Sequence, residues 1–191
     1  AVDGRVSAAA NAGAVPVLVA YHIPQRDCGS YSAGGAQSAE AYRAWIDNFA
    51  AGIGTRPAAV VVEPDAVAGL DCLNPADQQR RYELLRYAVN TLRARPQTAV
   101  YVDGGHSGWH SAATMAARLE QAGAKNARGF SLNVSNYGRT ADQVAYGNDV
   151  SQRLGGAKFI VDTSRNGNGP APGGEWCNPS GRALGERPTA S

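Results

Sequence analysis

Residues 58–65 read Ala-Ala-Val-Val-Val-Glu-Pro-Asp, a short β-branched run that ends in charged and turn-forming residues. A run of this length and composition predicts a strand over 58–63 that is buried on both faces, as in a parallel sheet. Four further runs predict strands of similar size, although the one at 129–133 is less apolar: 15–21, 98–102, 129–133 and 158–161. We therefore expect a mainly parallel sheet of about five strands.

Helical periodicity fills the intervals between these runs. Apolar residues recur three and four positions apart in four segments: 38–53, 75–95, 111–122 and 140–154. Alternating strands and helices predict an α/β fold. Five units are too few for a closed eight-unit barrel, which needs about 250 residues. The segment from 163 onward, rich in Gly, Pro and Asn, reads as a long loop, which favours an incomplete β/α barrel over an open sheet.

The composition excludes several classes of protein. With 43% hydrophobic and 18% charged residues, the 191-residue chain is expected to form one folded domain. No apolar run approaches the roughly 18 residues that cross a bilayer, so we expect no membrane partner. The net charge is +2 without a block of Lys and Arg, which gives no reason to expect nucleic-acid binding. Residues 1–14 lack the features of a signal peptide.

Carboxylates and amides follow the predicted strands. The set comprises Asp27, Asp65, Asp103, Asn136 and Asp162. Because the carboxyl ends of parallel strands meet at one edge, where α/β proteins carry their sites, we expect these side chains to converge. Asp65 alone could be a turn residue, Asp27 a salt-bridge partner of Arg26, and Asp162 a buried anchor. Carboxylates on neighbouring strands favour a site for acid–base chemistry.

Aromatic residues distinguish between two chemistries for this edge. Carboxylate and amide oxygens suit either acid–base catalysis or a hard metal ion. The same loops hold three aromatic side chains: Trp109, Tyr137 and Trp176. Flat rings beside hydrogen-bonding groups suit a sugar. A metal site formed by His106, His110 and Asp103 is an alternative, but the two histidines lie in a Gly-containing loop rather than on a helix face. We expect no metal and no cofactor.

Five segments resemble, in the same order, segments of one known family. Tyr-His-Ile-Pro-Gln-Arg-Asp-Cys at 21–28 and Val-Val-Glu-Pro-Asp-Ala-Val at 61–67 resemble its two signature motifs. Segments 102–109, 162–167 and 175–177 resemble further parts of it. The family is glycoside hydrolase family 6, whose members are inverting cellulases that cut β-1,4-glucans. The resemblance runs from about residue 15 to 185 and implies an incomplete, distorted β/α barrel.

The resemblance also implies roles for individual residues. Asp65 corresponds to the general acid that protonates the glycosidic oxygen, and Asp27 to a second carboxylate that helps to keep this acid protonated. Tyr21 corresponds to a ring that favours distortion of the sugar. Asp103 corresponds to a carboxylate that binds sugar and supports the acid. The remaining matches are the stacking platforms Trp109 and Trp176 and the cleft-lining residues Asn136, Tyr137, His106 and Arg165.

Three cysteines are present, at positions 28, 72 and 177. By themselves they are compatible with three thiols, or with one disulfide and an odd cysteine in an oxidising compartment. The resemblance implies a Cys28–Cys72 disulfide. It further implies that residues 1–191 form a single partial catalytic domain, without the family's first strand unit and without the C-terminal segment that carries the candidate base.

We therefore expect a secreted, monomeric enzyme that cleaves internal β-1,4-glucosidic bonds in cellulose and cello-oligosaccharides with inversion. The short interval between Asp65 and Cys72 leaves little room for a loop over the cleft, which favours internal cutting. Three alternatives remain: an exo-acting cellobiohydrolase, a glucan-binding fragment without turnover, and the metal-dependent hydrolase described above.

Overall fold

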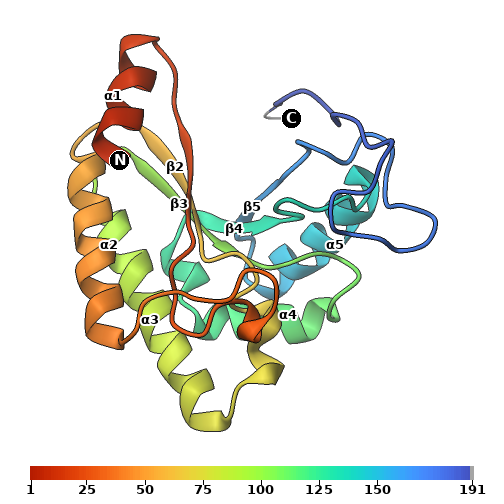
Figure 1. Cartoon of the computed structure of the whole chain (residues 1–191), viewed down its shortest axis with the longest axis horizontal. Coiled ribbons are helices and arrows are strands. Elements are labelled where there is room, and N and C mark those ends of the chain that lie inside the picture. Colours follow the sequence, from red (N-terminus) through yellow and green to blue (C-terminus); the bar gives the residue numbers. More distant parts are fainter. Residues whose placement is uncertain (190–191) are drawn as a thin grey trace.

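The computed structural model describes residues 1–189, in which five strands alternate with helices (Figure 1). The strands are β1 (Val17–Ala20), β2 (Ala58–Val62), β3 (Thr98–Asp103), β4 (Gly129–Leu132) and β5 (Lys158–Val161). The α-helices are α1 (Val2–Asn11), α2 (Ala39–Ile53), α3 (Pro75–Arg93), α4 (Ala112–Gln121) and α5 (Thr140–Arg153). The 3-10 helices are η1 (Asp27–Gly29), η2 (Ala68–Cys72) and η3 (Ala124–Asn126). The sequence predicted all five strands and helices α2 to α5, but not α1.

All five strands are parallel, and their order in the sheet follows the chain, β1-β2-β3-β4-β5. Each strand therefore pairs with the next one along the sequence, and the order never reverses as it does in an open doubly wound sheet. This is the strand order of a β/α barrel. The expected α/β fold, with a five-stranded parallel sheet in barrel order, is confirmed.

Local signals in the sequence fix where the helices begin. The Ser38 hydroxyl accepts a hydrogen bond from the Ala41 N–H at 3.1 Å, and Asn74 Oδ1 accepts one from the Asp77 N–H at 2.9 Å. Such caps satisfy N–H groups that have no partner within the helix, and each contributes about 1 kcal/mol. They set the start of α2 and α3, which pack against each other, and α3 also contacts β2 and β3.

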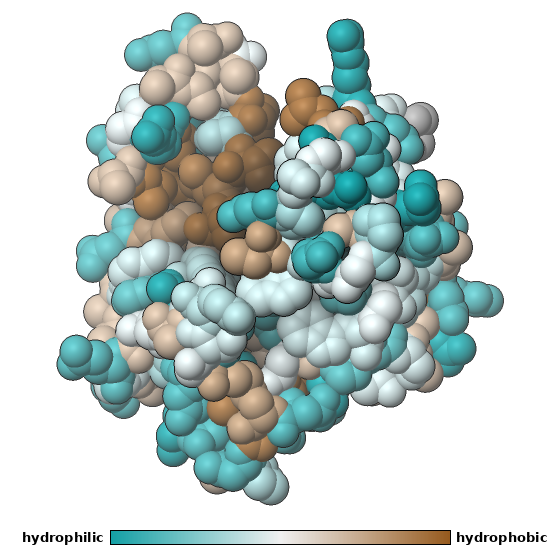
Figure 2. Space-filling model, turned by 45° about the vertical axis from the view of Figure 1, so that its right-hand side comes forward, coloured by the Kyte–Doolittle hydropathy of each residue, from teal (hydrophilic) through white to brown (hydrophobic). Residues whose placement is uncertain are grey.

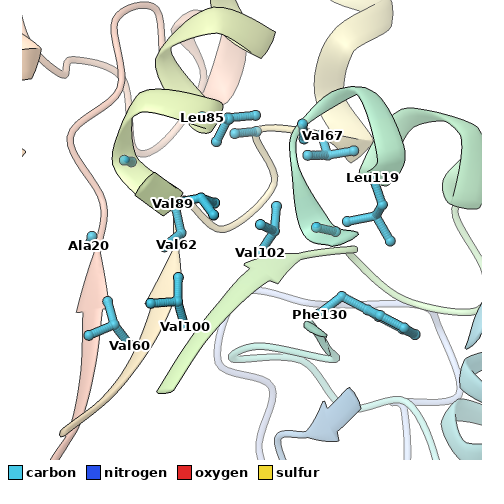
Figure 3. Packing of buried hydrophobic residues seen from close by; sticks show 14 of the residues in the cluster. Ala20, Val60, Val62, Val67, Leu85, Val89, Val100, Val102, Leu119 and Phe130 are labelled. Atoms are coloured by element: carbon cyan, nitrogen blue, oxygen red, sulfur yellow. The ribbon is translucent and has the colours of Figure 1, made fainter. Parts of the chain in front are cut away.

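One face of the sheet forms the core with these helices (Figure 3). Alternate residues of β2 and β3 point to α3, where they meet Leu85 and Val89; all are fully buried. The strand residues are Val60, Val62, Val100 and Val102. Each buried aliphatic side chain stabilises the fold by about 1.5–3 kcal/mol. This packing fixes the strands, and so fixes the loops that leave their carboxyl ends.

The opposite face of the sheet is less covered. In β1 the side chains of Val17 and Val19 are exposed, whereas Ala20 is buried. Val19 is in register with Val61, and Val61 with Tyr101, so these residues share one face. Figure 2 shows apolar surface in a hollow between two lobes of the molecule.

The segment after β5 is a long loop, as expected, and hydrogen bonds hold it against itself. The Gly167 N–H donates to the Ala183 carbonyl at 3.0 Å, and the Gly185 N–H donates to the Thr163 carbonyl at 2.8 Å. The two parts of this loop lie so close together that a Cβ on Gly185 would be 2.0 Å from Asn166 Oδ1. Over residues 1–189, no helix is both long and apolar enough to cross a membrane.

Candidate active site

Asp65 lies at the turn that follows β2. The turn holds it at φ +67°, a left-handed conformation that is unfavourable for a residue with a side chain. Its backbone N–H donates to Asp103 Oδ2 at 2.9 Å, which stabilises the turn. The Asp65 carboxyl is half-buried, and burial together with the negative charge of Asp27 raises its pKa. A carboxyl with a raised pKa can retain a proton and donate it.

Asp103, the last residue of β3, lies beneath this turn and is only 1% exposed. Its carboxylate accepts hydrogen bonds from the backbone N–H groups of Asp65 and Gly105, at 2.9 and 3.0 Å, and from the Ser131 hydroxyl at 3.1 Å. Burial and the charge of Asp65 raise the pKa of Asp103 to about 7. In this arrangement Asp103 orients the main chain of Asp65 and presents no exposed surface to a ligand.

The loop after β1 brings Tyr21 and Asp27 to the same place. Asp27 is half-buried, and its Oδ2 accepts a hydrogen bond from the Ser32 N–H at 2.6 Å. The guanidinium of Arg26 lies over the Tyr21 ring, 4.7 Å from its centre. Burial raises the pKa of Tyr21, and the charges of Asp65 and Asp27 raise it further. The structure therefore groups Tyr21, Asp27 and Asp65, as the sequence predicted for neighbouring strand ends.

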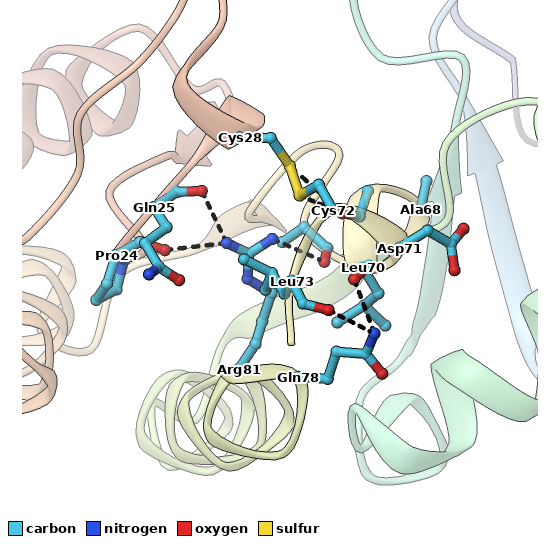
Figure 4. The surroundings of a disulfide bond; sticks show 12 residues. Pro24, Gln25, Cys28, Ala68, Leu70, Asp71, Cys72, Leu73, Gln78 and Arg81 are labelled. Carbon is cyan, nitrogen blue, oxygen red and sulfur yellow. Dashed lines mark hydrogen bonds between the residues drawn. A yellow bond between two sulfur atoms is a disulfide. The ribbon is translucent and has the colours of Figure 1, made fainter. Parts of the chain in front are cut away.

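A disulfide ties these two loops together (Figure 4). It joins Cys28 in η1 to Cys72 in η2, with 6.2 Å between the Cα atoms, and confirms the expected pairing. Cys28 follows Asp27 directly, and Cys72 follows the Asp65 turn by seven residues, so the bond links the two carboxylate loops covalently. Cys177 is exposed, and among residues 1–189 its thiol is the free one.

Two tryptophans of the predicted set expose their rings at this edge. Trp109 is 40% exposed and lies beside His106, with 5.6 Å between ring centres. Trp176 is 59% exposed, and its ring lies nearly perpendicular to that of Tyr31, with 5.1 Å between ring centres. Tyr31 belongs to the loop after β1, and the sequence did not single it out. Exposed flat rings of this kind can stack against the apolar face of a sugar.

The remaining predicted residues lie in the loops after β3, β4 and β5. Tyr137 is only 3% exposed because the Arg165 guanidinium covers its ring at 4.4 Å and hydrogen-bonds to its hydroxyl. Asn136 and His106 are half-buried, and burial lowers the pKa of His106, which favours the neutral ring. Tyr137 and Arg165 thus form a packed pair, whereas Asn136 and His106 keep some exposed surface.

The structure favours the anchor role for Asp162. Its two carboxylate oxygens accept hydrogen bonds from the backbone N–H groups of Ser135 and Ser164, each at 2.8 Å.

His110 Nε2, a candidate metal ligand, lies 2.8 Å from the Ala68 carbonyl oxygen. In the part of the chain that the structure describes, no three His, Cys, Asp or Glu side chains are arranged to hold a metal ion.

Sequence reasoning missed Glu63, the residue directly before the Pro-Asp turn. Its side chain is fully buried and accepts hydrogen bonds from the backbone N–H groups of His22 and Ile23 and from the Tyr42 hydroxyl. Burial raises the pKa of Glu63 to about 7. The available signal was a charged residue at the end of an otherwise apolar strand, because a carboxylate in that place needs buried hydrogen-bond donors.

Comparisons of the sequence and of the structure with known proteins agree on one family. A family model described as glycosyl hydrolases family 6 matches residues 1–191. Endoglucanase 1 of Streptomyces halstedii is 52% identical over 97% of the chain, and a probable 1,4-β-D-glucan cellobiohydrolase C of Aspergillus terreus is 31% identical over all of it. The structure of endoglucanase Cel6 from Mycobacterium tuberculosis, in complex with methyl-cellobiosyl-4-deoxy-4-thio-β-D-cellobioside, superposes with a TM-score of 0.95 over 98% of the chain, at 55% identity.

The chain spans only part of these proteins. It covers 57% of the Streptomyces sequence, 50% of the Aspergillus sequence and 65% of the solved Mycobacterium chain.

Proposed function

Because the chain belongs to glycosyl hydrolase family 6, we propose that the protein hydrolyses internal β-1,4-glucosidic bonds in cellulose and related glucans with inversion. The observation that carries this proposal is the grouping of a half-buried Asp65, whose pKa is raised, with Asp27 and Tyr21 beside exposed tryptophan rings. A relative 55% identical was solved with a thio-linked cellobioside derivative bound, which supports a glucan as substrate.

In this proposal Asp65 is the general acid. It donates its proton to the bridging oxygen as the glycosidic bond breaks, so that the leaving sugar departs as a neutral alcohol. Asp27 keeps that proton on Asp65 at higher pH, because two neighbouring carboxylates resist being ionised together. Asp103 holds the turn that aims Asp65, and Tyr21 crowds the sugar at the cleavage point.

We propose that none of the carboxylates discussed above is the base that activates water, and that another segment supplies it. An inverting enzyme needs a second carboxyl about 6.5–9.5 Å from the acid, with room for water between them. Asp103 and Asp162 are poor candidates because internal N–H and O–H groups occupy their oxygens. We accordingly treat residues 1–191 as part of a larger catalytic domain. The solved relative, matched over 65% of its length, has residues to supply the rest.

The sugar chain is proposed to lie along the carboxyl edge of the sheet. Trp109 and Trp176 stack on glucose rings, while Asn136 and His106 bond to hydroxyl groups through their exposed atoms. Tyr137 and Arg165 shape the floor as a packed pair. Such a surface needs no cofactor. The disulfide supports a secreted protein because such bonds persist outside the cytosol, and we propose that it acts as a monomer.

Internal cutting is favoured over release of cellobiose from chain ends. The chain is 52% identical to an endoglucanase and 31% identical to a probable cellobiohydrolase. Only six residues separate Asp65 from Cys72, which limits any loop that could roof the cleft. An endoglucanase lowers the viscosity of carboxymethylcellulose steeply for each reducing end formed, and this ratio tests the choice.

The acid assignment is tested with Asp65→Asn in the protein as its gene encodes it. We expect kcat on carboxymethylcellulose to fall by about 10²–10⁴-fold, because the amide has no proton of suitable acidity to donate. With 2,4-dinitrophenyl β-cellobioside the fall should be much smaller, since that leaving group departs without protonation. The two substrates together separate loss of the acid from loss of the fold.

The control is the binding of cellotetraose by calorimetry, which should persist in Asp65→Asn. Activity equal to that of the wild type on both substrates would reject Asp65 as the acid. Binding of cellotetraose by a wild-type protein that releases no reducing ends would favour the glucan-binding alternative instead.

A further inference from the structure

We propose that Glu63 and Arg81 are positioning residues that hold the loop carrying Tyr21 and Asp27 in a fixed place relative to Asp65. The inference rests on the proposed function and deepens it. Glu63 and Asp65 belong to the same turn after β2, but their side chains lie in different surroundings. Asp65 is half-buried at the edge of the site, whereas Glu63 is fully buried behind it.

The Glu63 carboxylate holds the loop by accepting hydrogen bonds from the loop's backbone N–H groups. The His22 N–H lies 3.1 and 2.9 Å from the two Glu63 oxygens, and the Ile23 N–H lies 2.9 Å from Oε2. The Tyr42 hydroxyl donates to Oε1 at 3.0 Å, which fixes the carboxylate from the side of α2. Glu63 also donates its own backbone N–H to the Ala20 carbonyl at 2.8 Å. The end of β1 is thus tied to the residue two positions before Asp65.

The Arg81 guanidinium holds the next part of the same loop by donating hydrogen bonds to the loop's carbonyl groups (Figure 4). This residue of α3 is only 4% exposed, and its Nη2 donates to the carbonyl oxygens of Pro24 and Gln25 at 3.0 and 2.8 Å. Its Nη1 lies 3.5 Å from the Ala66 carbonyl, in the residue after Asp65. One buried cation therefore contacts both the loop of Asp27 and the turn of Asp65.

The hydrogen bonds of Glu63 and Arg81 hold four consecutive residues, 22–25, between the proposed catalytic groups Tyr21 and Asp27. Tyr21 precedes His22 directly, and Asp27 follows Gln25 by two positions. Opposite charges hold the two halves of this segment, Glu63 at its N–H groups and Arg81 at its carbonyls, and each charge favours the other across the buried space. Removal of either side chain would release its own half of the segment and leave the other charged group buried without its partner.

The groups that face each carboxyl are limited in number. Tyr42 and Arg81 face Glu63, and Asp27, Asp103 and Tyr21 face Asp65. The charge of Asp27 helps to raise the pKa of Asp65. The Cys28–Cys72 disulfide still holds the loop beyond Asp27, so its release lets Asp27 shift rather than depart. A longer distance between the two carboxyls should lower the pKa of Asp65 even though no atom of Asp65 has changed.

The test is made on Glu63→Ala, with Asp162→Ala as a matched control. Asp162 is also a carboxylate after a strand that accepts two backbone N–H bonds, but it holds a different loop. In Glu63→Ala we expect kcat to fall by about 10²-fold, as for a misplaced site, with KM little changed. The basic limb of the pH–rate profile should move to lower pH. A ¹³C NMR titration should show the pKa of Asp65 falling by roughly 0.5 or more, and staying at its wild-type value in Asp162→Ala.

Two further variants keep the test decisive. Glu63→Gln retains an oxygen that can accept from His22 and Ile23, and should restore most of the kcat and the pKa of Asp65. If Glu63→Ala does not fold, Arg81→Met replaces it and should move the same two quantities.

A purely structural role would lower the thermal midpoint without moving the pKa of Asp65 in the folded variants, and that result would overturn the proposal. The NMR readout needs no turnover. Full activity of Asp65→Asn would therefore reject the proposed function while leaving the positioning of the loop to be judged separately.

Discussion

The two edges of the sheet are built from the same strands but handle the backbone differently. At the carboxyl edge, residues with side chains adopt positive φ: Gln25, Asp27, Cys28, Glu63, Asp65, Asn133, Ser135 and Asn178. At the amino edge, the turns from helix to strand use glycine for positive φ, at Gly13, Gly54, Gly123, Gly155 and Gly156. Glycine adopts this conformation without steric cost, whereas a residue with a side chain pays about 1–3 kcal/mol.

The buried charges follow the same division. Asp103 and Glu63 are buried at the carboxyl edge with a raised pKa. The amino edge has a cavity of about 350 Å³ bordered by the exposed cations Arg93, Arg128 and Lys158. Unfavourable backbone and buried carboxylates persist only where surrounding contacts hold them. The comparison teaches that strain and buried charge in this fold are concentrated where the proposed chemistry takes place.

After Asp65→Asn, the largest effect is expected from removing the disulfide. A bond between residues 44 apart in sequence should stabilise the protein by about 4 kcal/mol, because it restricts the unfolded chain. The double variant Cys28→Ser/Cys72→Ser should show this loss in urea unfolding, and activity should fall as the two carboxylate loops separate. Cys177→Ser is the control and should change neither quantity. An unchanged stability in the double variant would mean that the carboxyl edge needs no covalent support.

The next effect concerns the dependence of stability on pH. The pKa of Asp103 is about 7 in the folded protein, above its ordinary value of 3.8. Its contribution to stability is therefore fully present below about pH 4 and is lost as the pH rises through about 7. We expect the free energy of unfolding to fall by roughly 1–4 kcal/mol over this window from Asp103 alone.

Asp103→Asn should make that dependence shallower, because the amide does not ionise, while Glu63, whose pKa is also raised to about 7, keeps part of it. Urea unfolding measured from pH 4 to pH 8 checks this expectation. Asp47→Asn, which alters an exposed carboxylate on α2, is the control and should keep the wild-type slope. A slope in Asp103→Asn as steep as that of the wild type would place the titrating group elsewhere.

A smaller effect is expected from the exposed ring of Trp176. Truncation in Trp176→Ala removes one stacking surface, worth about 0.5–1.5 kcal/mol, so the Kd for cellotetraose should rise roughly 2- to 10-fold. The stability should change little because the ring is 59% exposed. Leu184→Ala, which trims another exposed side chain of the same segment, should leave the Kd unchanged. A Kd unaffected by Trp176→Ala would exclude this ring from the proposed path of the sugar chain.

The smallest effect is expected at the amino edge. Arg128→Gln removes an exposed cation beside the 350 Å³ cavity, and surface changes of this kind usually alter stability by less than about 0.5 kcal/mol. Both kcat and KM on carboxymethylcellulose should stay within about twofold of the wild type. A loss of activity beyond tenfold would contradict the division between the two edges.

Much of this arrangement could be predicted from local sequence patterns. Short β-branched runs ending in polar residues predicted the five strands, and the shared direction of parallel strands predicted that the loops carrying Asp27 and Asp65 lie together. These inferences succeeded because periodicity and strand polarity are local properties. Helix α1 was missed because its Ala-rich sequence has little amphipathic pattern.

The surroundings of each side chain could not be predicted in this way. Glu63 is buried because N–H groups some 40 residues earlier in the chain point at it. Asp103 is hidden because Asp65, Gly105 and Ser131 converge on its carboxylate. The Arg165 guanidinium covers Tyr137 from a loop 28 residues away. Sequence spacing indicates which strand end carries a residue, but only the tertiary contacts decide whether it faces solvent.

The exposed valines of β1 have a practical consequence for handling the protein. Val17 and Val19 put branched apolar side chains in contact with water on a strand at the edge of the sheet, a combination that promotes association between molecules. Preparations of residues 1–191 should therefore bind the dye ANS and scatter light increasingly with concentration. Kinetic work on this polypeptide is best carried out on dilute, freshly filtered samples.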